Sequence, residues 1–179
     1  MNLGKISGRY AHALYALAEE KSLTEQIFKQ FTHLSEIFVQ LPQLSAALAN
    51  PMYSAADKEK LLVTATGAKT DSLLADFFNF VIAKGRAEFM VFMVSSYIDR
   101  YRKDKKIVLG KITSAVTLSD DALAKVKQLV SKLYNSDVNL TASTNSELIG
   151  GFVLELNNSR YDASVRTELN EIKQQLISA

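Results

Sequence analysis

SELIGGFVLELNNSRYDASVRTELNEIKQQL, residues 146–176, combines a turn, a strand, a second turn and an amphipathic helix without a break. Gly150 and Gly151 permit a sharp backbone path or a close approach, which a residue with a Cβ adopts only at a cost. The apolar alternation over residues 152–157 predicts a strand with one buried and one mixed face. The Asn-Asn-Ser sequence at residues 157–159 is typical of a turn and predicts the end of that strand.

An amphipathic helix is predicted to close this stretch. Either Asp162 or Ser164 caps its start, because both side chains can accept backbone N–H bonds. Apolar residues then recur at steps of four, three and four along one side, at Val165, Leu169, Ile172 and Leu176. We expect this side of the helix to be core rather than interface.

The first 105 residues have helical periodicity almost throughout. In the first helix, Ile6, Tyr10, Leu14 and Leu17 recur at steps of four, four and three, and alanines fill much of the remaining surface. Six predicted helices cover roughly residues 6–18, 22–41, 44–49, 54–66, 71–84 and 86–105, the last being the longest. Helices joined by such short loops form a compact bundle.

Side chains that accept backbone N–H bonds precede three of these helices. Either Ser22 or Thr24 is predicted to cap the second helix, Ser54 the fourth, and either Asp71 or Ser72 the fifth.

The periodicity changes from helical to strand-like after the basic residues that end at Lys106. Apolar residues at even positions over 107–118 predict a strand. Ser119-Asp120-Asp121 is predicted to cap a helix, and a further strand is predicted at residues 138–141. The residues predicted inside along that helix are Leu123, Val126, either Leu129 or Val130, and Leu133. The sequence therefore predicts an α+β fold, with an amino-terminal six-helix bundle over 1–105 and a small carboxy-terminal α+β domain over 106–179.

Two motifs in the carboxy-terminal stretch resemble a known family. The motif IGGF at residues 149–152, a strand, and then YDASVR at residues 161–166 before a leucine helix resemble the carboxy-terminal signature of the delta subunit of F-type ATP synthase. The mitochondrial relative of that subunit is the oligomycin-sensitivity-conferring protein. The family pattern has Gly after the Asp where this chain has Ala163, and alanine predicts a less extreme φ there.

Shorter matches to the same family lie in the helical part. They are GRYAHALY at residues 8–15, Asn-Pro at 50–51 with KLL at 60–62, and KGR at 84–86. The order of a six-helix bundle and a small α+β domain is also similar to this family. The resemblance thus covers nearly the whole chain and is best at its end.

Length and composition are those of a folded protein. The 179 residues are 47% apolar and 22% charged, and a net charge of +2 does not require a polyanionic partner. The first ten residues lack the apolar core of a signal peptide. The longest apolar run, residues 89–98, is interrupted by two serines and falls short of the roughly 20 residues that span a bilayer. We expect a soluble protein that can still belong to a membrane assembly.

No group of residues has the pattern of a catalytic or metal site. The chain has no cysteine, and its two histidines, His12 and His33, lie in predicted helices distant in sequence from Ser164 and lack the spacing of a helical metal pair. Ser164 is better explained as a helix-start residue than as a nucleophile. Gly150-Gly151 is not followed by the residues of a phosphate loop. We predict no enzyme activity, no cofactor and no metal.

Two segments have features of binding sites, and each has a structural alternative. Residues 100–106 contain five basic side chains, which can hold phosphates or lipid headgroups but also compensate the dipole at a helix end. The helix over residues 71–84 is apolar on nearly every side, so it is either buried in the bundle or forms part of a groove for a partner helix.

The family resemblance implies a function that the patterns do not. Delta subunits sit on the catalytic head of ATP synthase, where the bundle holds amino-terminal helices of the alpha subunits, and the carboxy-terminal domain holds the carboxy-terminal end of the b subunit of the peripheral stalk. The resemblance implies a stator link that couples rotor torque to ATP synthesis, peripheral at the cytoplasmic face of the cell membrane. On this basis the alpha-subunit groove is predicted between the first helix and the helix over 71–84, at Tyr10, Ala13, Leu14, Leu17, Phe77, Phe80 and Val81.

A competing hypothesis is a helical-bundle RNA-binding module of the antitermination-factor type. The basic segment and a pI of 8.7 permit it. The nearly balanced charge and the absence of an aromatic platform beside the basic run disfavour it. Salt dependence discriminates between the two, because binding to several phosphates weakens steeply with salt.

Overall fold

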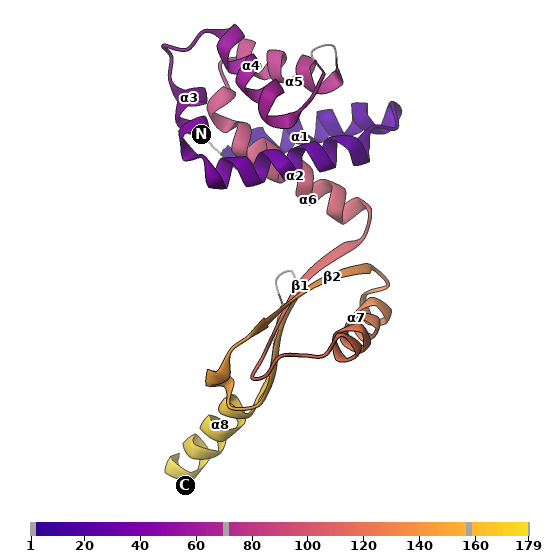
Figure 1. The fold of residues 1–179 in the computed structure, drawn as a ribbon, viewed down its shortest axis with the longest axis vertical. Helices are drawn as coiled ribbons and strands as arrows, with labels where there is room; N and C mark the ends of the chain where they lie inside the picture. Colours follow the sequence, from indigo (N-terminus) through magenta and orange to yellow (C-terminus); the bar gives the residue numbers. More distant parts are fainter. Residues whose placement is uncertain (1–2, 70–71, 157–158, 179) are drawn as a thin grey trace. The chain divides into compact units, whose positions relative to one another are not determined.

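A computed structural model describes residues 3–69, 72–156 and 159–178. The chain divides into two compact units, residues 1–104 and 105–179. The regular elements in the described part of the first unit are helices, and the second unit combines a four-stranded sheet with helices (Figure 1). The predicted α+β fold class is confirmed.

The first unit is the predicted six-helix bundle. Its helices are α1 (Leu3–Glu20), α2 (Thr24–Gln40), α3 (Pro42–Ala49), α4 (Ala55–Thr66), α5 (Leu73–Ala83) and α6 (Met90–Asp104). The prediction that the last helix is the longest is wrong, since α6 has 15 residues and α1 has 18. A 3₁₀ turn at Ala87–Phe89 replaces the start of the predicted helix.

An aromatic cluster forms the centre of the bundle and joins α2, α5 and α6. The ring of Phe31 meets that of Tyr97 edge to face at 5.1 Å and stacks on that of Phe78 at 6.4 Å, and all three are fully buried. Ala11 and Ala18 are also buried, on the face by which α1 packs along α6. These small side chains allow the two helices to approach closely.

Two of the predicted helix caps are confirmed. Ser54 and Asp57 form a capping box at the start of α4, in which each side chain accepts a backbone N–H of the other residue. At the start of α5, the Ser72 side chain accepts the N–H of Ala75 at 3.3 Å. The alternative cap, Asp71, lies outside the described residues.

The predicted cap of α2 is wrong. Leu23 is the N-cap residue and makes no side-chain cap bond. Ser22 precedes it with a φ of 56°, and Thr24 is already the first residue of the helix. The turn between α1 and α2 is instead closed by backbone bonds, including that from Leu23 N–H to the carbonyl of Ala18 at 2.8 Å.

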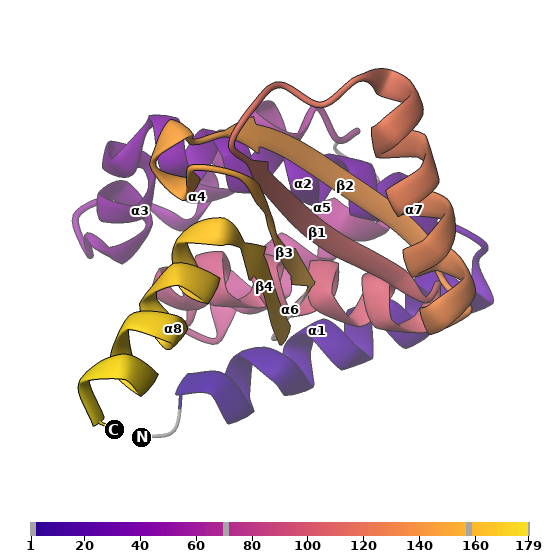
Figure 2. The same ribbon diagram turned by 90° about the horizontal axis from the view of Figure 1, so that it is seen from below.

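The second unit is built on a sheet of order β2-β1-β3-β4. Its elements are β1 (Ile107–Ser114), α7 (Asp120–Tyr134), β2 (Asp137–Thr144), a 3₁₀ turn (Ser146–Leu148), β3 (Gly151–Leu156), β4 (Ser159–Ser164) and α8 (Val165–Ser178). Strands β1 and β2 are parallel and joined through α7, whereas β3 is antiparallel to β1 and to β4. Figure 2 shows α7 running alongside β1 and β2, while α8 continues from β4.

Residues of β1, β2, β3 and α7 form the core of this unit. In the register, Ile112 of β1 stands opposite Leu154 of β3, and both pack with Val138 and with Val130 of α7. Val130 is therefore the inward residue of the two alternatives, whereas Leu129 is 67% exposed. The prediction that Leu133 lies inside is wrong, because this side chain is exposed. The predicted Ser119 cap of α7 is confirmed by its bond from the N–H of Ala122.

Two strand boundaries differ from the prediction. Strand β1 ends at Ser114, and Val116, expected inside the strand, is 71% exposed. Strand β4 was not predicted at all, because Ser159–Ser164 has no apolar alternation and five of its six residues are exposed. The backbone pairing with β3, rather than an apolar pattern, makes this segment a strand. Ser159, expected in a turn, begins β4, and residues 157 and 158 of that turn lie outside the described residues.

The two residues on the apolar side of α8 whose side chains the structure describes are not buried as predicted. Leu169 is 50% exposed and Val165 is 36% exposed, while the side chains of Ile172 and Leu176 lie outside the described ones. Ser164 caps this helix, since its Oγ accepts the N–H of Thr167 at 3.3 Å. Ala163 does not have a positive φ, as expected because alanine, unlike glycine, has a Cβ.

None of the helices in the described part of the chain is both long and apolar enough to cross a bilayer.

A candidate groove for a partner helix

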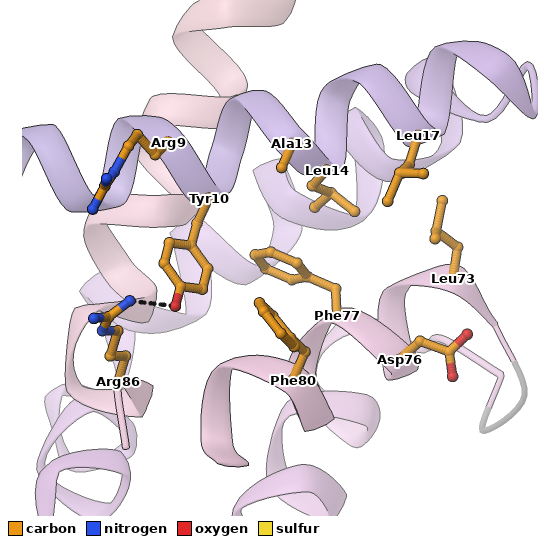
Figure 3. Close-up of a pocket in the computed structure, with 10 residues that line it drawn as sticks. All are labelled: Arg9, Tyr10, Ala13, Leu14, Leu17, Leu73, Asp76, Phe77, Phe80 and Arg86. Atoms are coloured by element: carbon orange, nitrogen blue, oxygen red, sulfur yellow. Dashed lines mark hydrogen bonds between the residues drawn. The ribbon is translucent and has the colours of Figure 1, made fainter. Parts of the chain in front are cut away.

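A groove of about 560 Å³ lies between α1 and α5 in the first unit (Figure 3). Its walls are mainly apolar. The lining residues are Arg9, Tyr10, Ala13, Leu14 and Leu17 of α1, Leu73, Asp76, Phe77 and Phe80 of α5, and Arg86.

The α1 wall exists because this helix has two apolar sides. Ala11, Tyr15 and Ala18 are buried in the bundle, whereas Tyr10 is half-buried and Leu17 is 46% exposed. The predicted apolar stripe of this helix is therefore divided, and its Tyr10 and Leu17 side chains face the groove. Figure 3 shows them on the same wall as Ala13.

Helix α5 is apolar on nearly every side, and its apolar residues are divided between the bundle core and the wall of the groove. Phe78 and Val81 are fully buried in the bundle, Phe77 is mostly buried, and Phe80 is 51% exposed. Six of the seven residues predicted for the groove line it. The exception is Val81, which belongs to the bundle core and does not line the groove.

Four lining residues were missed by the sequence analysis: Arg9, Leu73, Asp76 and Arg86. A signal for two of them was available. Leu73 lies three residues before Asp76 and four before Phe77, and Phe80 lies four residues after Asp76, so helical spacing places them along one side of α5. Arg86 follows α5 and cannot be placed by helical periodicity, because the chain turns at Gly85.

Aromatic and cationic side chains form one end of the groove. The Arg86 guanidinium donates a hydrogen bond to the Tyr10 hydroxyl and lies 5.3 Å from the centre of its ring. The rings of Tyr10 and Phe80 are 5.8 Å apart, and the Lys84 ammonium lies 5.7 Å from the Phe80 ring. These contacts hold the exposed aromatic surface in a fixed arrangement, which favours binding of an apolar segment.

Charge differs between the two ends of the groove. Arg9 lies near Arg86 beside Tyr10, and Asp76 lies at the other end beside Leu73 and Leu17 (Figure 3). Among the described residues, neither Arg9 nor Asp76 has an ion-pair partner.

A second hollow of about 840 Å³ lies between α2, α3 and α4 and was not predicted. Its apolar lining includes Leu41, Tyr53 and Leu61, which are all exposed, with Asp57 and Lys60 among its polar residues.

The basic segment at residues 100–106 is partly engaged within the first unit. The Arg100 guanidinium lies 5.8 Å from the Tyr15 ring, and that of Arg102 lies 6.0 Å from the Phe28 ring. The Tyr15 hydroxyl donates a 2.7 Å bond to Asp104. Burial, and secondly this bond to a carboxylate, raise the pKa of Tyr15 well above its usual value.

The residues considered as candidates for catalysis or metal binding have structural roles or do not form a site together. Ser164 is 1% exposed and lies 2.7 Å from the Asp162 carboxylate, whose pKa is lowered chiefly by the bond from that hydroxyl. His12 and His33 are exposed on α1 and α2. Among the residues that the structure describes, no group of three or more histidine, aspartate or glutamate side chains is placed to hold a metal ion.

Comparisons with known proteins give a consistent result. The family model described as "ATP synthase delta (OSCP) subunit" matches residues 6–176. The ATP synthase subunit delta of Phocaeicola vulgatus is 36% identical over 179 residues, covering 99% of this chain and 97% of the relative. That of Parabacteroides distasonis is 35% identical over 177 residues, covering 99% and 98%.

A solved structure has the same fold. A chain in the cryo-EM structure of the Toxoplasma gondii mitochondrial ATP synthase hexamer matches with a TM-score of 0.68 at 17% identity, covering 96% of this chain and 97% of that one.

Proposed function

Because the chain belongs to the ATP synthase delta (OSCP) subunit family, we propose that it is a non-catalytic stator subunit of an ATP synthase. In this role it links the alpha/beta catalytic head to the peripheral stalk, so that the head does not turn with the rotor. The subunit is peripheral to the membrane, at its cytoplasmic face. It transmits force and catalyses no reaction itself.

The first unit binds the head through the groove between α1 and α5. The observation that carries this proposal is the groove itself, in which Leu17 and Phe80 expose about half of their surface. The occupant is an amino-terminal helix of an alpha subunit, whose apolar side covers these residues. Ala13, which lines the groove between them, leaves room for the close approach of a helix backbone.

Calorimetric titration tests this half of the proposal. The probe is a synthetic peptide of roughly the first 20 residues of the alpha subunit from the same genome, with an unrelated amphipathic peptide and a short single-stranded RNA as controls. Saturable binding of the alpha peptide alone is expected, and it should persist at high salt because apolar contacts are not screened. Salt-sensitive binding of the RNA with no binding of the peptide would instead favour the RNA-binding hypothesis.

An Ala13→Glu variant locates the binding site. The introduced charge places a polar group among apolar groove residues, so affinity for the alpha peptide should fall at least tenfold while circular dichroism is unchanged. Gly8→Glu is a matched control on the same helix, since no atom lies within 4 Å of its Cβ position and it does not line the groove. Equal affinities of the two variants would remove the groove from consideration.

The second unit binds the carboxy-terminal end of the stalk b subunit. We assign this contact to a patch formed by Ile149, Val165 and Leu169, which are 67%, 36% and 50% exposed. The N–H of Val165 donates to the carbonyl of Gly150 at 3.1 Å, so the start of α8 adjoins the loop that carries Ile149.

The backbone of Ile149 supports a functional role for this patch. Ile149 has a φ of 67° and a ψ of −41°, a region that β-branched residues rarely occupy. Such strain typically costs about 1–3 kcal/mol, yet the side chain is not buried in compensation. An exposed isoleucine held in this conformation is better explained by a contact with a partner than by the stability of the unit.

Replacing Ile149 by Gly separates binding from stability. The variant should be as stable as the parent or more stable, because glycine accepts this φ, but should bind a peptide of the b-subunit carboxy terminus at least fivefold more weakly. The control is Leu133→Ser, at an apolar side chain that is 75% exposed on α7. Serine is used there because glycine would weaken the helix. Weaker binding by both variants would count against this patch.

A further inference from the structure

Among the described residues that line the groove between α1 and α5, charged side chains lie only at its two ends. Arg9 and Arg86 lie at one end and Asp76 at the other, and the side chains between them are apolar or aromatic (Figure 3). The Tyr10–Phe80 ring contact marks the cationic end, and Lys84 beside Phe80 adds a further positive charge there.

We infer that the groove binds its helix in one direction only, with acidic residues of the helix at Arg9 and Arg86 and a basic residue at Asp76. This inference rests on the proposed function and specifies the chemistry of the partner. Charge complementarity of this kind fixes orientation and excludes the reversed arrangement more than it adds affinity.

The length of the groove sets the spacing of these groups. On α1 the lining residues extend from Arg9 to Leu17, a rise of about 12 Å, which equals slightly more than two helical turns. A helix lying along this wall therefore presents about three apolar residues, at i, i+3 or i+4, and i+7. Its acidic and basic residues flank this stripe and therefore lie more than two turns apart.

Arg86 is well placed to pair with an acidic residue of the bound helix. Its hydrogen bond to the Tyr10 hydroxyl and its position over the Tyr10 ring restrict the guanidinium, so less side-chain entropy is lost when it pairs with a carboxylate. Asp76 is exposed on α5 and has no ion-pair partner in the described part of the chain. Both ends of the groove can therefore pair without first breaking an ion pair within the bundle.

The test compares two alpha-subunit peptides of identical composition. One has the native sequence, and in the other the charged residues at the two ends of the apolar stripe are exchanged. The native peptide should bind about tenfold more tightly at low salt, and the difference should shrink at high salt. Against a protein carrying both Arg9→Glu and Asp76→Lys, the preference should diminish or reverse. The two substitutions change the charge by −2 and +2, so the double variant keeps the net charge of the parent and a change in preference cannot be due to net charge.

Spin labels determine the direction of binding independently. Since the chain has no cysteine, Lys5→Cys near the start of α1 and Lys21→Cys just after its end each provide a unique attachment point, about 24 Å apart. The label at position 5 should broaden the NMR signals of the acidic end of the bound native peptide, and the label at position 21 those of the basic end. Equal binding of both peptides, or the opposite broadening pattern, would overturn the inference. If neither peptide binds, the proposed function fails as well.

Discussion

At the scale of single residues, buried hydroxyl groups make the stability of the first unit sensitive to alkaline pH. The hydroxyls of Tyr15 and Tyr97 are both enclosed within the bundle, where they bond to the Asp104 carboxylate and to the Thr24 carbonyl. Burial is the main cause that raises the pKa of each above the ordinary 10.0. Ionising either one inside the bundle would place a negative charge in a poorly solvated site.

The sign of the pH effect follows from these raised pKa values. Near pH 10 the unfolded chain begins to lose the two protons while the folded chain keeps them, so the stabilisation is complete below pH 10 and declines above it. The free energy of unfolding should fall by up to about 1.4 kcal/mol per pH unit for each tyrosine.

Urea unfolding between pH 9 and 11.5, followed by circular dichroism, measures this slope. Tyr15→Phe and Tyr97→Phe should each be less stable than the parent at neutral pH, because a hydrogen bond is lost, and each should show a shallower decline above pH 10. Parallel curves for parent and variants would show that these two hydroxyls do not control the alkaline transition.

Single residues also show which local features could be predicted from the sequence. The caps Ser54, Ser72 and Ser119 were predicted because a short polar side chain before an apolar stripe has a local mechanism. Leu23 at the start of α2 was not predicted, since a backbone bond to Ala18 closes that turn without any side-chain cap. Such a bond has no signature in residue type.

At the scale of elements, the β3–β4 hairpin depends on the glycine at its start. A Cβ at Gly151 would lie 2.1 Å from the carbonyl oxygen of Ala163, and its φ is +73°. We expect Gly151→Ala to destabilise the second unit by more than about 3 kcal/mol, since it combines backbone strain with a collision against the paired strand.

Gly67→Ala separates the two causes. Gly67 has a similar φ of +61° but no atom within 4 Å of its Cβ position, so its substitution should cost only about 1–2 kcal/mol. Amide hydrogen exchange reports each unit separately, on β3 for one variant and α4 for the other. Similar losses of protection in both would mean that strain alone accounts for the effect at Gly151.

The elements differ in how much their own sequence reveals. In α2 the apolar residues Ile27, Phe31, Leu34 and Phe38 recur at helical spacing and are buried, because one helix face packs on the bundle. Leu41 continues this spacing just after the helix but is exposed. Strand β4 was missed because its side chains are polar and its conformation is set by pairing with β3. For α8 and α5 the stripe was recognised, but periodicity does not reveal whether an apolar face meets its own core or remains available.

At the scale of the whole molecule, the two units have separate cores. The Phe31, Phe78 and Tyr97 cluster lies within residues 1–104, and the cluster around Ile112 lies within residues 105–179. Ending the chain after Lys106 should therefore leave a folded bundle that binds the alpha peptide within about twofold of the full chain and has lost binding to the b peptide.

Circular dichroism and the two titrations test this division. Helical signal and a cooperative thermal transition should both persist in residues 1–106. Loss of both binding activities, or of the transition, would show that the bundle needs the second unit in order to fold.

The packing of α1 along α6 has a consequence for synthesis of the chain. About 70 residues separate the end of α1 from the start of α6, so the first helix leaves the ribosome long before the helix against which Ala11 and Ala18 are buried. At 5–20 residues per second this interval lasts roughly 4–14 seconds. During it the nascent chain presents an unburied apolar helix to chaperones, and the bundle closes only when its last helix emerges.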